Sequence, residues 1–264
     1  MLRSVFAKTI WEQRRALLGW TIGITAVGVF YAAFYPAMNA PDIAEVMENM
    51  APELMEALGF TAIATPAGYL GSTTFGLLTP ILIIVLGTWL GVRAVAGDED
   101  AGRLDVLLAH PISRTRVAVE RFGSLIVTIV IVCLVLFLAL VAISGPAELS
   151  EIGTANLLAA SLHLAVLGTF FGGLALAVGA ATGSRTIASA AVGVIAVVSY
   201  FANTLAAQID AIAWARDLSP FRYYSGGRPL VNGVQPLDLA VLVVAAISIV
   251  AIGTALFSRR DVAV

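Results

Sequence analysis

The chain has 264 residues, of which 59% are hydrophobic and only 12% are charged, and its formal net charge at pH 7 is −2. Its mean hydropathy is +0.95. Soluble domains carry about a quarter charged residues, so this chain has too few to cover a water-soluble surface of its length. The slightly acidic balance argues against a nucleic-acid-binding protein, which needs a basic face. The single cysteine, Cys133, leaves no partner for an intrachain disulfide or a thiolate metal site.

Six stretches are free of Asp, Glu, Lys and Arg and long enough to cross a bilayer, which takes roughly 20 mostly apolar residues. A charge at the middle of the bilayer costs at least about 3 kcal/mol on insertion scales, so such windows indicate spanning helices. We therefore predict an all-α polytopic membrane protein that forms a single transmembrane domain over residues 1–264. The six windows are residues 16–38, 73–92, 122–144, 155–183, 186–208 and 239–258.

The basic residues are distributed unevenly among the segments between these windows. Twelve of the fifteen lie in four segments: before the first window, between windows two and three, between windows four and five, and after the last window. The other three, Arg216, Arg222 and Arg228, lie between windows five and six. Because cytoplasmic loops carry an excess of Lys and Arg, both termini are predicted to be cytoplasmic. The expected location is the cytoplasmic (inner) membrane of a prokaryote, and the use of arginine in place of lysine is a compositional hint of that origin.

Two segments outside the windows have amphipathic helical patterns. Residues 1–15 read as an interfacial helix in the headgroup plane, with Trp11 as an anchor; the alternative is a basic flank that only sets the topology. Residues 41–59, in the first outer loop, combine an apolar stripe with five acids. A lid packed on the ends of the spans and a gate for substrate are both compatible with that pattern.

The segment from Gly97 to Arg116, between windows two and three, is the most informative part of the chain. Its acids at 98–100 suit a helix N-terminus, where unpaired N–H groups favour negative charge. Pro111 is expected to end that helix, and Ser113 to cap the next one, which continues into window three. Three leucines share one face at spacings of three and four residues: Leu104, Leu107 and Leu108. A short stiff helix with an apolar knob is therefore predicted on the cytoplasmic side; the alternative is that the three leucines rest on the bilayer surface.

This segment resembles the signature of ABC-2 type transporter permeases. The residues that match the signature are Glu99, Gly102, Leu104, Leu107, Leu108, Pro111, Ile112, Ser113 and Arg114. Arg103 replaces the usual Thr, Asp105 the usual Glu, and Arg121 a common Lys, and the first of these changes leaves its local contact in doubt. A second stretch, residues 218–224 (LSPFRYY), is similar to a Leu-Ser-Pro-Phe motif of the same family.

The resemblance implies a permease subunit of an ATP-driven exporter. In that family the loop between spans two and three is a coupling helix that seats on a separate ATP-binding subunit, of which two copies are expected. The implied coupling interface comprises Glu99, Gly102, Leu104, Asp105, Leu107, Leu108, Pro111 and Arg114. A second permease copy or a paralogue is implied as well, with the substrate path at their interface lined mainly by spans two and five. The sequence has no Gly-x-x-x-x-Gly-Lys-[Ser/Thr] loop, so we expect the partner to bind ATP and Mg and this chain to bind no cofactor.

A few polar residues within the windows are candidates for function. His163 is an intramembrane ionisable group, and a neutral histidine bonded to a neighbouring helix is the favoured interpretation. Thr79, Thr88, Tyr200 and Asn203 could line a path, although hydrogen bonding between helices explains them equally well. The glycines at 168, 172 and 173 are interpreted as packing sites for small residues.

Other classes of membrane protein require residues that the windows largely lack. An intramembrane protease needs paired acids or a Ser-His pair within the spans, and a proton-coupled carrier usually buries Asp or Glu there. The windows contain only His163, which disfavours both an intramembrane enzyme and a secondary, ion-driven transporter. A membrane scaffold protein stays open, because its sequence would carry no distinguishing chemistry. We predict no catalytic residues and no metal site.

Overall fold

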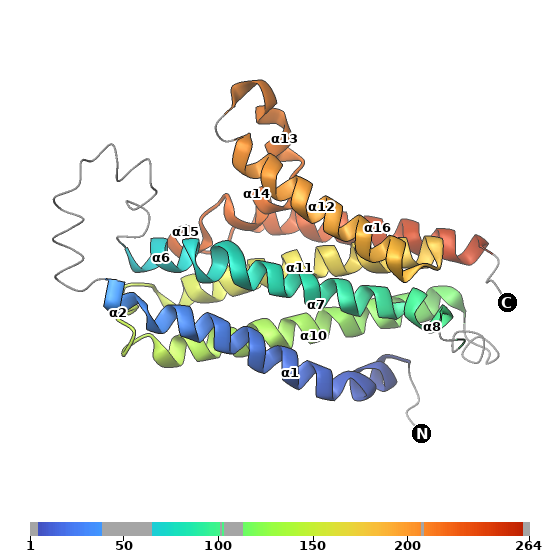
Figure 1. Ribbon diagram of the computed structural model, residues 1–264, viewed down its shortest axis with the longest axis horizontal. Coiled ribbons are helices and arrows are strands. Elements are labelled where there is room, and N and C mark those ends of the chain that lie inside the picture. Colours follow the sequence, from blue (N-terminus) through green and yellow to red (C-terminus); the bar gives the residue numbers. More distant parts are fainter. Residues whose placement is uncertain (1–4, 39–64, 101, 103–112, 207–208, 261–264) are drawn as a thin grey trace.

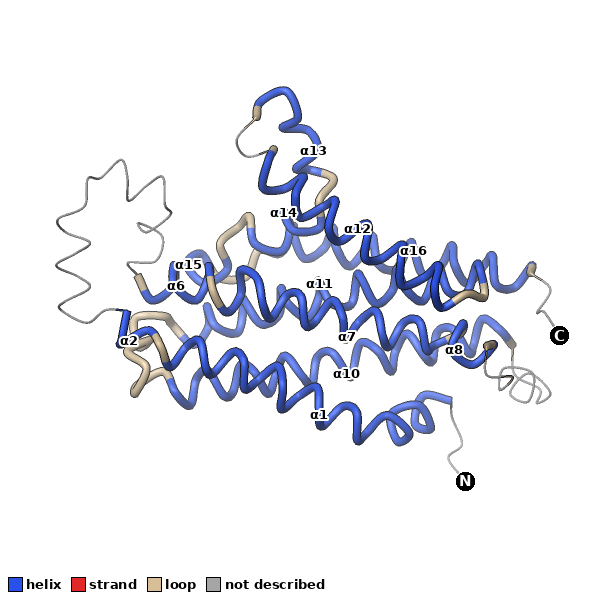
Figure 2. The backbone as a smooth tube through the Cα atoms, viewed as in Figure 1, coloured by secondary structure: helices blue, strands red, loops and turns tan. Residues whose placement is uncertain are grey.

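The computed structural model describes residues 5–38, 65–100, 102, 113–206 and 209–260. Within these residues every regular element is a helix and no strand is found (Figure 2). Six helical segments are long and apolar enough to cross a membrane, which confirms the predicted all-α polytopic fold. Their bounds are Val5–Met38, Pro66–Ala94, Arg114–Ile143, Thr154–Thr182, Arg185–Leu205 and Pro236–Arg259.

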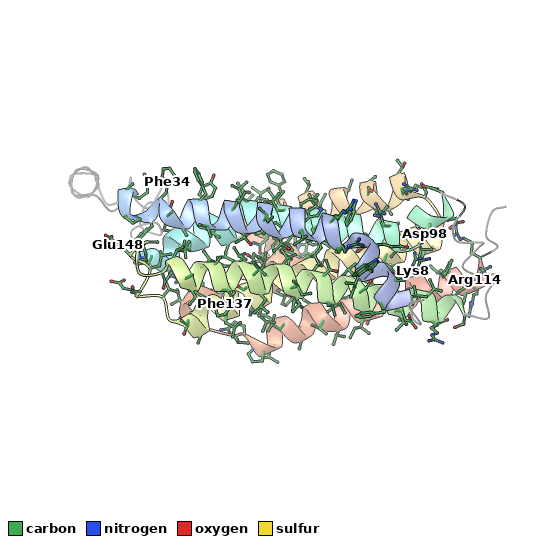
Figure 3. The ribbon with its side chains drawn as sticks, turned by 90° about the horizontal axis from the view of Figure 1, so that it is seen from below. Lys8, Phe34, Asp98, Arg114, Phe137 and Glu148 are labelled. Atoms are coloured by element: carbon green, nitrogen blue, oxygen red, sulfur yellow. The ribbon has the colours of Figure 1, made fainter. Side chains whose placement is uncertain are left out.

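The spanning helices run lengthwise beside one another, and both ends of the described chain lie at the same end of the bundle (Figure 1). We call this the terminal end and the opposite one the far end. Lys8, Asp98 and Arg114 lie at the terminal end, whereas Phe34 and Glu148 lie at the far end (Figure 3). Charged side chains therefore gather where the bundle meets water and headgroups, as a bilayer requires.

The first helix, α1 (Val5–Ala33), begins well before the predicted window and is followed by the short α2 (Tyr35–Met38). Its first turns, which carry Lys8, run at an angle to the rest of the helix (Figure 3). The carboxylate of Glu120 accepts a hydrogen bond at 3.0 Å from the Phe6 N–H, one of the first amides of α1, which lack a partner within the helix. The segment predicted as an interfacial helix is thus continuous with the first span, and its placement in the headgroup plane stays a prediction.

The second span consists of α6 (Pro66–Ser72), the π-helical η1 (Thr74–Leu78) and α7 (Thr79–Ala94). Pro80 explains the wide turn, because a proline ring collides with the carbonyl four residues earlier in a regular α-helix. In the π register the Thr79 hydroxyl donates to the Thr74 carbonyl at 2.5 Å. A side chain at Gly76 would lie 2.6 Å from the Gly71 carbonyl oxygen, so the wide turn requires glycine there.

The fourth spanning helix, α11 (Thr154–Thr182), is the centre of the bundle. In its most apolar stretch 78% of the residues are buried, against 17% in the first span and 17% in α12 (Arg185–Leu205). It packs against α7, against α10 (Arg114–Ile143), against α12 and against α16 (Pro236–Arg259). Helix α12 leans away from the others toward its C-terminus (Figure 1). A large part of the apolar surface of α12 is therefore left exposed within the chain.

The contact between α7 and α11 depends on glycine. A Cβ at Gly87 would lie 2.6 Å from the Gly168 carbonyl oxygen, and a Cβ at Gly91 would collide with the Gly172 carbonyl. The two backbones therefore touch, as is usual where small residues line a membrane helix interface. This confirms the interpretation of Gly168 and Gly172 as packing sites.

Short helices connect α12 to α16 at the far end. They are η2 (Asp210–Ile212), α13 (Ala213–Asp217), α14 (Pro220–Ser225) and α15 (Pro229–Asn232). Ser219 caps α14 and also donates to the Ser199 carbonyl at 2.7 Å, which ties this connection to α12. The second stretch of the family signature thus forms a capped turn at the far end.

Candidate functional site

Helix α7 ends and helix α10 begins at the terminal end of the bundle, so both sides of the segment that connects them lie there (Figure 1). Of the predicted coupling residues, the structure describes Glu99, Gly102 and Arg114. Gly102 has a left-handed backbone with φ of 64°, which suits glycine. Ser113 caps α10 by accepting a hydrogen bond from the Arg116 N–H, as predicted. The remaining members of the predicted interface lie outside the described residues: Leu104, Asp105, Leu107, Leu108 and Pro111.

Three consecutive acids at this end each pair with an arginine of a different helix. Asp98 pairs with Arg121 of α10, and Glu99 pairs with Arg260, which follows α16. Asp100 pairs with Arg185, the first residue of α12, with its Oδ2 atom 2.9 Å from Nε. We call these six residues the arginine hub. The sequence suggested only that the acids suit a helix N-terminus, and it did not predict the hub.

The local helix geometry explains how neighbouring acids reach different helices. The acids lie in and directly after the short helix α8 (Ala96–Glu99), where successive side chains point about 100° apart. The chain turns from α7 into α8 at Val95, whose φ of −132° and ψ of −65° are not helical. Val95 is buried against Ala180 of α11 and Phe257 of α16. The turn that presents the acids is therefore fixed by apolar packing.

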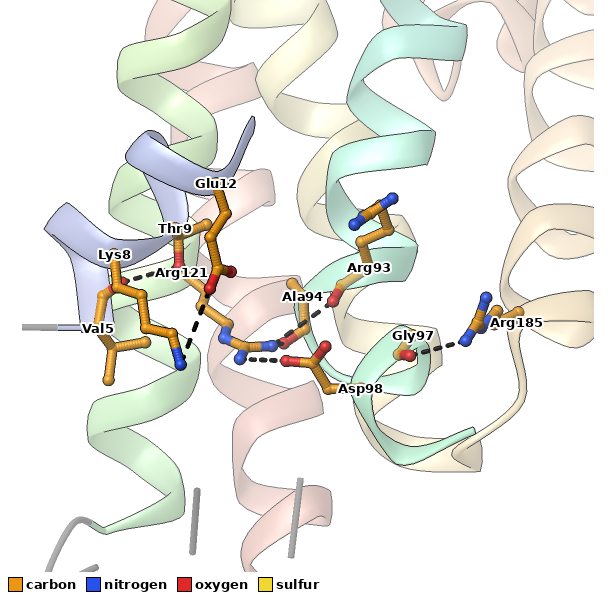
Figure 4. Close-up of polar contacts among 10 residues, drawn as sticks. All are labelled: Val5, Lys8, Thr9, Glu12, Arg93, Ala94, Gly97, Asp98, Arg121 and Arg185. Carbon is orange, nitrogen blue, oxygen red and sulfur yellow. Dashed lines mark hydrogen bonds and ion pairs between the residues drawn. The ribbon is translucent and has the colours of Figure 1, made fainter. Parts of the chain in front are cut away.

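The arginines also bind main-chain oxygens at the end of α7. Arg121 donates to the carbonyl of Ala94 and, at 3.5 Å, to that of Arg93. Arg185 donates to the carbonyl of Gly97 at 2.7 Å (Figure 4). The last carbonyls of a helix lack partners within it, so these bonds satisfy groups that would otherwise need water. The hub thus joins α10 and α12 to the end of the second span through both charge and backbone.

Arg114, which follows the segment over residues 100–113, binds the C-terminal end of α16. Its guanidinium donates to the carbonyl of Phe257 at 3.0 Å and to that of Arg260, and it lies 5.4 Å from the centre of the Phe257 ring. Glu99, before the segment, pairs with Arg260 of the same region. Both ends of the segment over residues 100–113 are therefore fixed to the last turn of α16. Glu99 and Arg114, which the resemblance places in the coupling interface, make these contacts within the chain.

The hub pairs differ in burial. Arg121 is buried, with 9% of its side chain exposed, and 18% of its partner Asp98 is exposed. The Asp100 and Arg185 side chains are 44% and 46% exposed. Removing one member of a buried pair leaves an uncompensated charge and costs about 3–5 kcal/mol, whereas exposed pairs contribute about 0–1 kcal/mol. The Glu99 and Arg260 side chains are 9% and 23% exposed. The pairs of Asp98 and Glu99 are therefore the main electrostatic ties, and the Asp100 pair is the weak one.

The exposed pair gives a prediction of a small effect. We expect Asp100→Asn to lower the stability of the protein by less than about 1 kcal/mol, because both side chains are solvated and Arg185 keeps its bond to Gly97. Thermal unfolding in lipid nanodiscs measures this change. A loss as large as that of a buried pair would show that Asp100 has a structural role that its exposure does not explain.

A polar cavity of about 300 Å³ lies beside the hub, between the first turns of α1 and the ends of α7 and α10. Lys8, Glu12 and Arg121 line it. The pair between Lys8 and Glu12 is long, at 3.8 Å, and solvated, so it contributes little (Figure 4). Nε of Arg121 and Oε1 of Gln13 are buried and have no hydrogen-bond partner among the described residues. The cavity is large enough for water, which can satisfy both groups.

The predicted path residues do not form one cluster. Thr88 lines a groove of about 470 Å³ between α7 and α12 and donates to its own helix at Ile84. Tyr200 and Asn203 lie farther along α12, where the Tyr200 ring packs edge-on against Phe221. Thr79 is fully buried and bonded within its own span. Only Thr88 of the four therefore faces a groove between spans two and five.

His163 joins α11 to the far-end connection. Its Nε2 atom accepts a hydrogen bond at 3.2 Å from the Gln235 N–H, and its Nδ1 lies 3.3 Å from the Tyr223 carbonyl oxygen. An imidazole that accepts at Nε2 carries its proton on Nδ1, which donates to that carbonyl. The side chain is fully buried. The interpretation of His163 as a hydrogen-bonded residue is confirmed, and its neutral state, which these two bonds favour, stays a prediction.

Among the described residues no group of three or more His, Cys, Asp or Glu could hold a metal ion. The site that the structure brings together is the hub, which carries charge but no nucleophile. The comparisons agree with a transport role: the family model described as "Multidrug efflux system permease Rv1217c, C-terminal domain" matches residues 2–258. That range includes all of the hub except Arg260, which lies two residues beyond its end. No curated protein matches the chain.

Proposed function

The chain belongs to the family described as "Multidrug efflux system permease Rv1217c, C-terminal domain", and we propose that it is the membrane subunit of an ATP-binding-cassette exporter of the ABC-2 kind. In this proposal a separate subunit binds ATP and Mg and hydrolyses the nucleotide. Residues 97–116 are the element that receives its movement. The family membership makes the chain a membrane permease, and the source of energy is the part that we propose.

The observation that carries the proposal is that the residues on either side of 100–113, Glu99 and Arg114, are both bound to the end of α16. A permease driven from outside the bilayer must convert the movement of a soluble subunit into movement of its spans, which requires a stiff, bistable connection rather than a loose loop. Glu99 and Arg114 fix both sides of the segment to the last turn of α16. Asp98 and Asp100 extend the connection to α10 and α12. A displacement of the segment would thus act on three spans at once.

The composition of the spans supports an external source of energy. The six windows contain no Asp or Glu, so a proton-coupled carrier would have to work without a buried carboxylate. His163, the one ionisable histidine among them, uses both ring nitrogens in structural hydrogen bonds. The chain has no phosphate-binding loop, and Lys8 is its only lysine. These features favour ATP hydrolysed by a partner over an ion gradient.

The distribution of charge supports a cytoplasmic terminal end. The hub arginines, the N-terminal basic residues and Arg259 all belong to the side that is rich in basic residues, and the far end has only Arg216, Arg222 and Arg228. The positive-inside rule then directs the terminal end to the cytoplasm. This orientation presents residues 97–116 to a cytoplasmic ATPase.

A second permease copy is part of the proposal. Helix α12 exposes a continuous apolar surface that includes Val194, Val198 and Phe201, each more than half exposed. The groove between α7 and α12, lined by Thr88 and Trp89, opens beside that surface. A partner copy packed there would enclose a path between spans two and five, with Thr88 on its wall and Tyr200 and Asn203 toward its far end. Lipid could cover the apolar surface of α12 instead of a second copy. The oligomeric state of the purified protein distinguishes the two: a dimer supports the proposed partner copy, and a monomer supports lipid contact.

Co-purification with an ATP-binding-cassette ATPase, sought among the products of the genes next to that of this permease, tests the proposal. The wild-type chain should retain the ATPase, and Leu107→Arg plus Leu108→Arg should release it, because two charges would replace an apolar knob. Leu218→Arg plus Leu237→Arg is a matched control, since both leucines lie toward the far end and are 75% and 83% exposed. The control pair should retain the ATPase. If the first pair also retains it, residues 97–116 are not the contact.

A further inference from the structure

A preformed cavity lies at the far end, on the opposite side of the bundle from the hub. It has a volume of about 570 Å³ and lies between α6, α11 and the turn from α14 to α15. Small residues such as Gly71 and Ala160 leave the space of the cavity unfilled. Its apolar walls include Phe75, Pro229 and Leu230. Sites for small organic ligands are concave, mostly apolar and of this size. The proposed path between spans two and five does not include this cavity.

The walls of the cavity are held by hydrogen bonds between separate segments. The Tyr224 hydroxyl donates to the Phe75 carbonyl at 2.7 Å, and burial raises the pKa of that hydroxyl well above its usual value, so it stays a donor. The Asn156 amide donates to the carbonyl of Leu230 at 3.1 Å. Phe75 belongs to the π-helical η1, a type of turn that occurs frequently at functional sites. The cavity is thus defined by the fold.

Arg228 gives the cavity its charge. It is the only ionisable acid or base among the described lining residues apart from the buried phenol of Tyr224. Its backbone is left-handed, with φ of 51° and ψ of 65°, which costs a non-glycine residue roughly 1–2 kcal/mol. No ion pair of Arg228 is found in the described ranges, whereas Arg222 nearby pairs with Asp217 at 3.0 Å. Within the described part of the chain, this apolar cavity has one guanidinium without an ion pair and no carboxylate, which makes it complementary to an apolar molecule that ends in an anion.

We infer that the far-end cavity binds an anionic amphiphile, with its apolar part against Phe75 and Leu230 and its acidic group on Arg228. The acidic group of an exported compound and the phosphate of an anionic lipid share this chemistry. If the bound amphiphile is the exported substrate, the inference rests on the proposed function and names acidic amphiphiles as the substrate class. Binding itself does not require the ATPase.

Single-cysteine labelling of the permease alone tests the inference. Cys133 is buried, so Ser72→Cys places an accessible thiol on the cavity wall. In phosphatidylcholine nanodiscs, dodecylsulfonate should slow the maleimide reaction of this thiol several-fold, and dodecyltrimethylammonium should slow it less. Arg228→Gln should remove the difference between the two probes, and Arg228→Lys should keep part of it.

The chain offers a matched control for labelling. Ser258→Cys lies in a groove of about 580 Å³ between α10 and α16, and none of the described residues that line that groove is charged. There the two probes should act alike. Equal protection of Ser72→Cys by both probes, or protection by dodecylsulfonate that survives in Arg228→Gln, would overturn the inference.

Nanodiscs made with phosphatidylglycerol distinguish the two sources of the anion. If this lipid alone slows the labelling of Ser72→Cys in an Arg228-dependent way, the anion site stands and the occupant is a lipid headgroup. If only the soluble probe protects, the site is free for cargo. Because no ATPase is present in these experiments, their failure would leave the co-purification test of the proposed function unaffected.

Discussion

Arg121→Met is expected to destabilise the protein by about 3 kcal/mol or more, because it leaves the carboxylate of Asp98 without its buried partner. It also removes the donors to the carbonyls of Ala94 and Arg93 at the end of α7. Methionine has similar length and is apolar, so the loss of packing should be small. The midpoint of thermal unfolding in nanodiscs, followed by size-exclusion chromatography, measures the loss.

A double variant separates the charge from the shape of the side chain. When Asp98→Leu is added to Arg121→Met, the carboxylate that lost its arginine is removed as well, and part of the lost stability should return. The return should be incomplete, because the two carbonyls of α7 still lack the Arg121 donor. If the double variant is less stable than Arg121→Met alone, the charge of Asp98 is not what destabilises the single variant, and the pair with Arg121 is of minor importance.

Gly91→Ala is expected to have the second large effect, since it separates the two helices at the centre of the bundle. The added Cβ would collide with the Gly172 carbonyl and lie 2.7 Å from the Cβ of Ala175, closer than such atoms approach. Overpacking of a tight core costs typically about 1–3 kcal/mol, and backbone atoms cannot rotate away as a side chain can. A reduced yield of folded protein and a lower unfolding midpoint should result.

Gly19→Ala is the matched control for this substitution. Gly19 lies on α1, and no atom lies within 4 Å of the position that a Cβ would occupy. The same substitution should there be neutral or slightly stabilising, because alanine favours helix more than glycine does. Equal losses for Gly91→Ala and Gly19→Ala would mean that the α7–α11 contact tolerates a wider separation than the structure indicates.

The fold could be predicted because the bilayer constrains it strongly. A window free of charge is a necessary property of a span, and α11 and α16 follow the predicted windows closely: α11 within one residue, and α16 within three at its start. The windows were too short where a helix continues past its apolar part. Helix α10 begins at Arg114, eight residues before its window, because charged residues such as Arg116 and Glu120 are good helix formers outside the hydrocarbon.

The hub could not be predicted, since its partners are far apart in the sequence. A local pattern assigns Asp98 and Glu99 to a helix N-terminus, but α8 has only four residues and the acids pair across the bundle instead. The one available signal was that Arg121, Arg185 and Arg260 each lie at the end of a predicted span on the same side as the acids. For Thr79 and Thr88 the sequence gives position along a helix but not the direction in which each side chain points.

The proposed source of energy is ATP hydrolysed by a partner subunit, and the most direct measurement is the rate of ATP hydrolysis by the candidate ATPase with and without this permease in the same nanodiscs. We expect the wild-type permease to change the rate several-fold. Leu107→Arg plus Leu108→Arg should abolish the change, while Leu218→Arg plus Leu237→Arg should preserve it. A rate that does not respond to the wild-type permease, or that responds equally to the permease altered at Leu107 and Leu108, would mean that this ATPase does not drive the permease through residues 97–116.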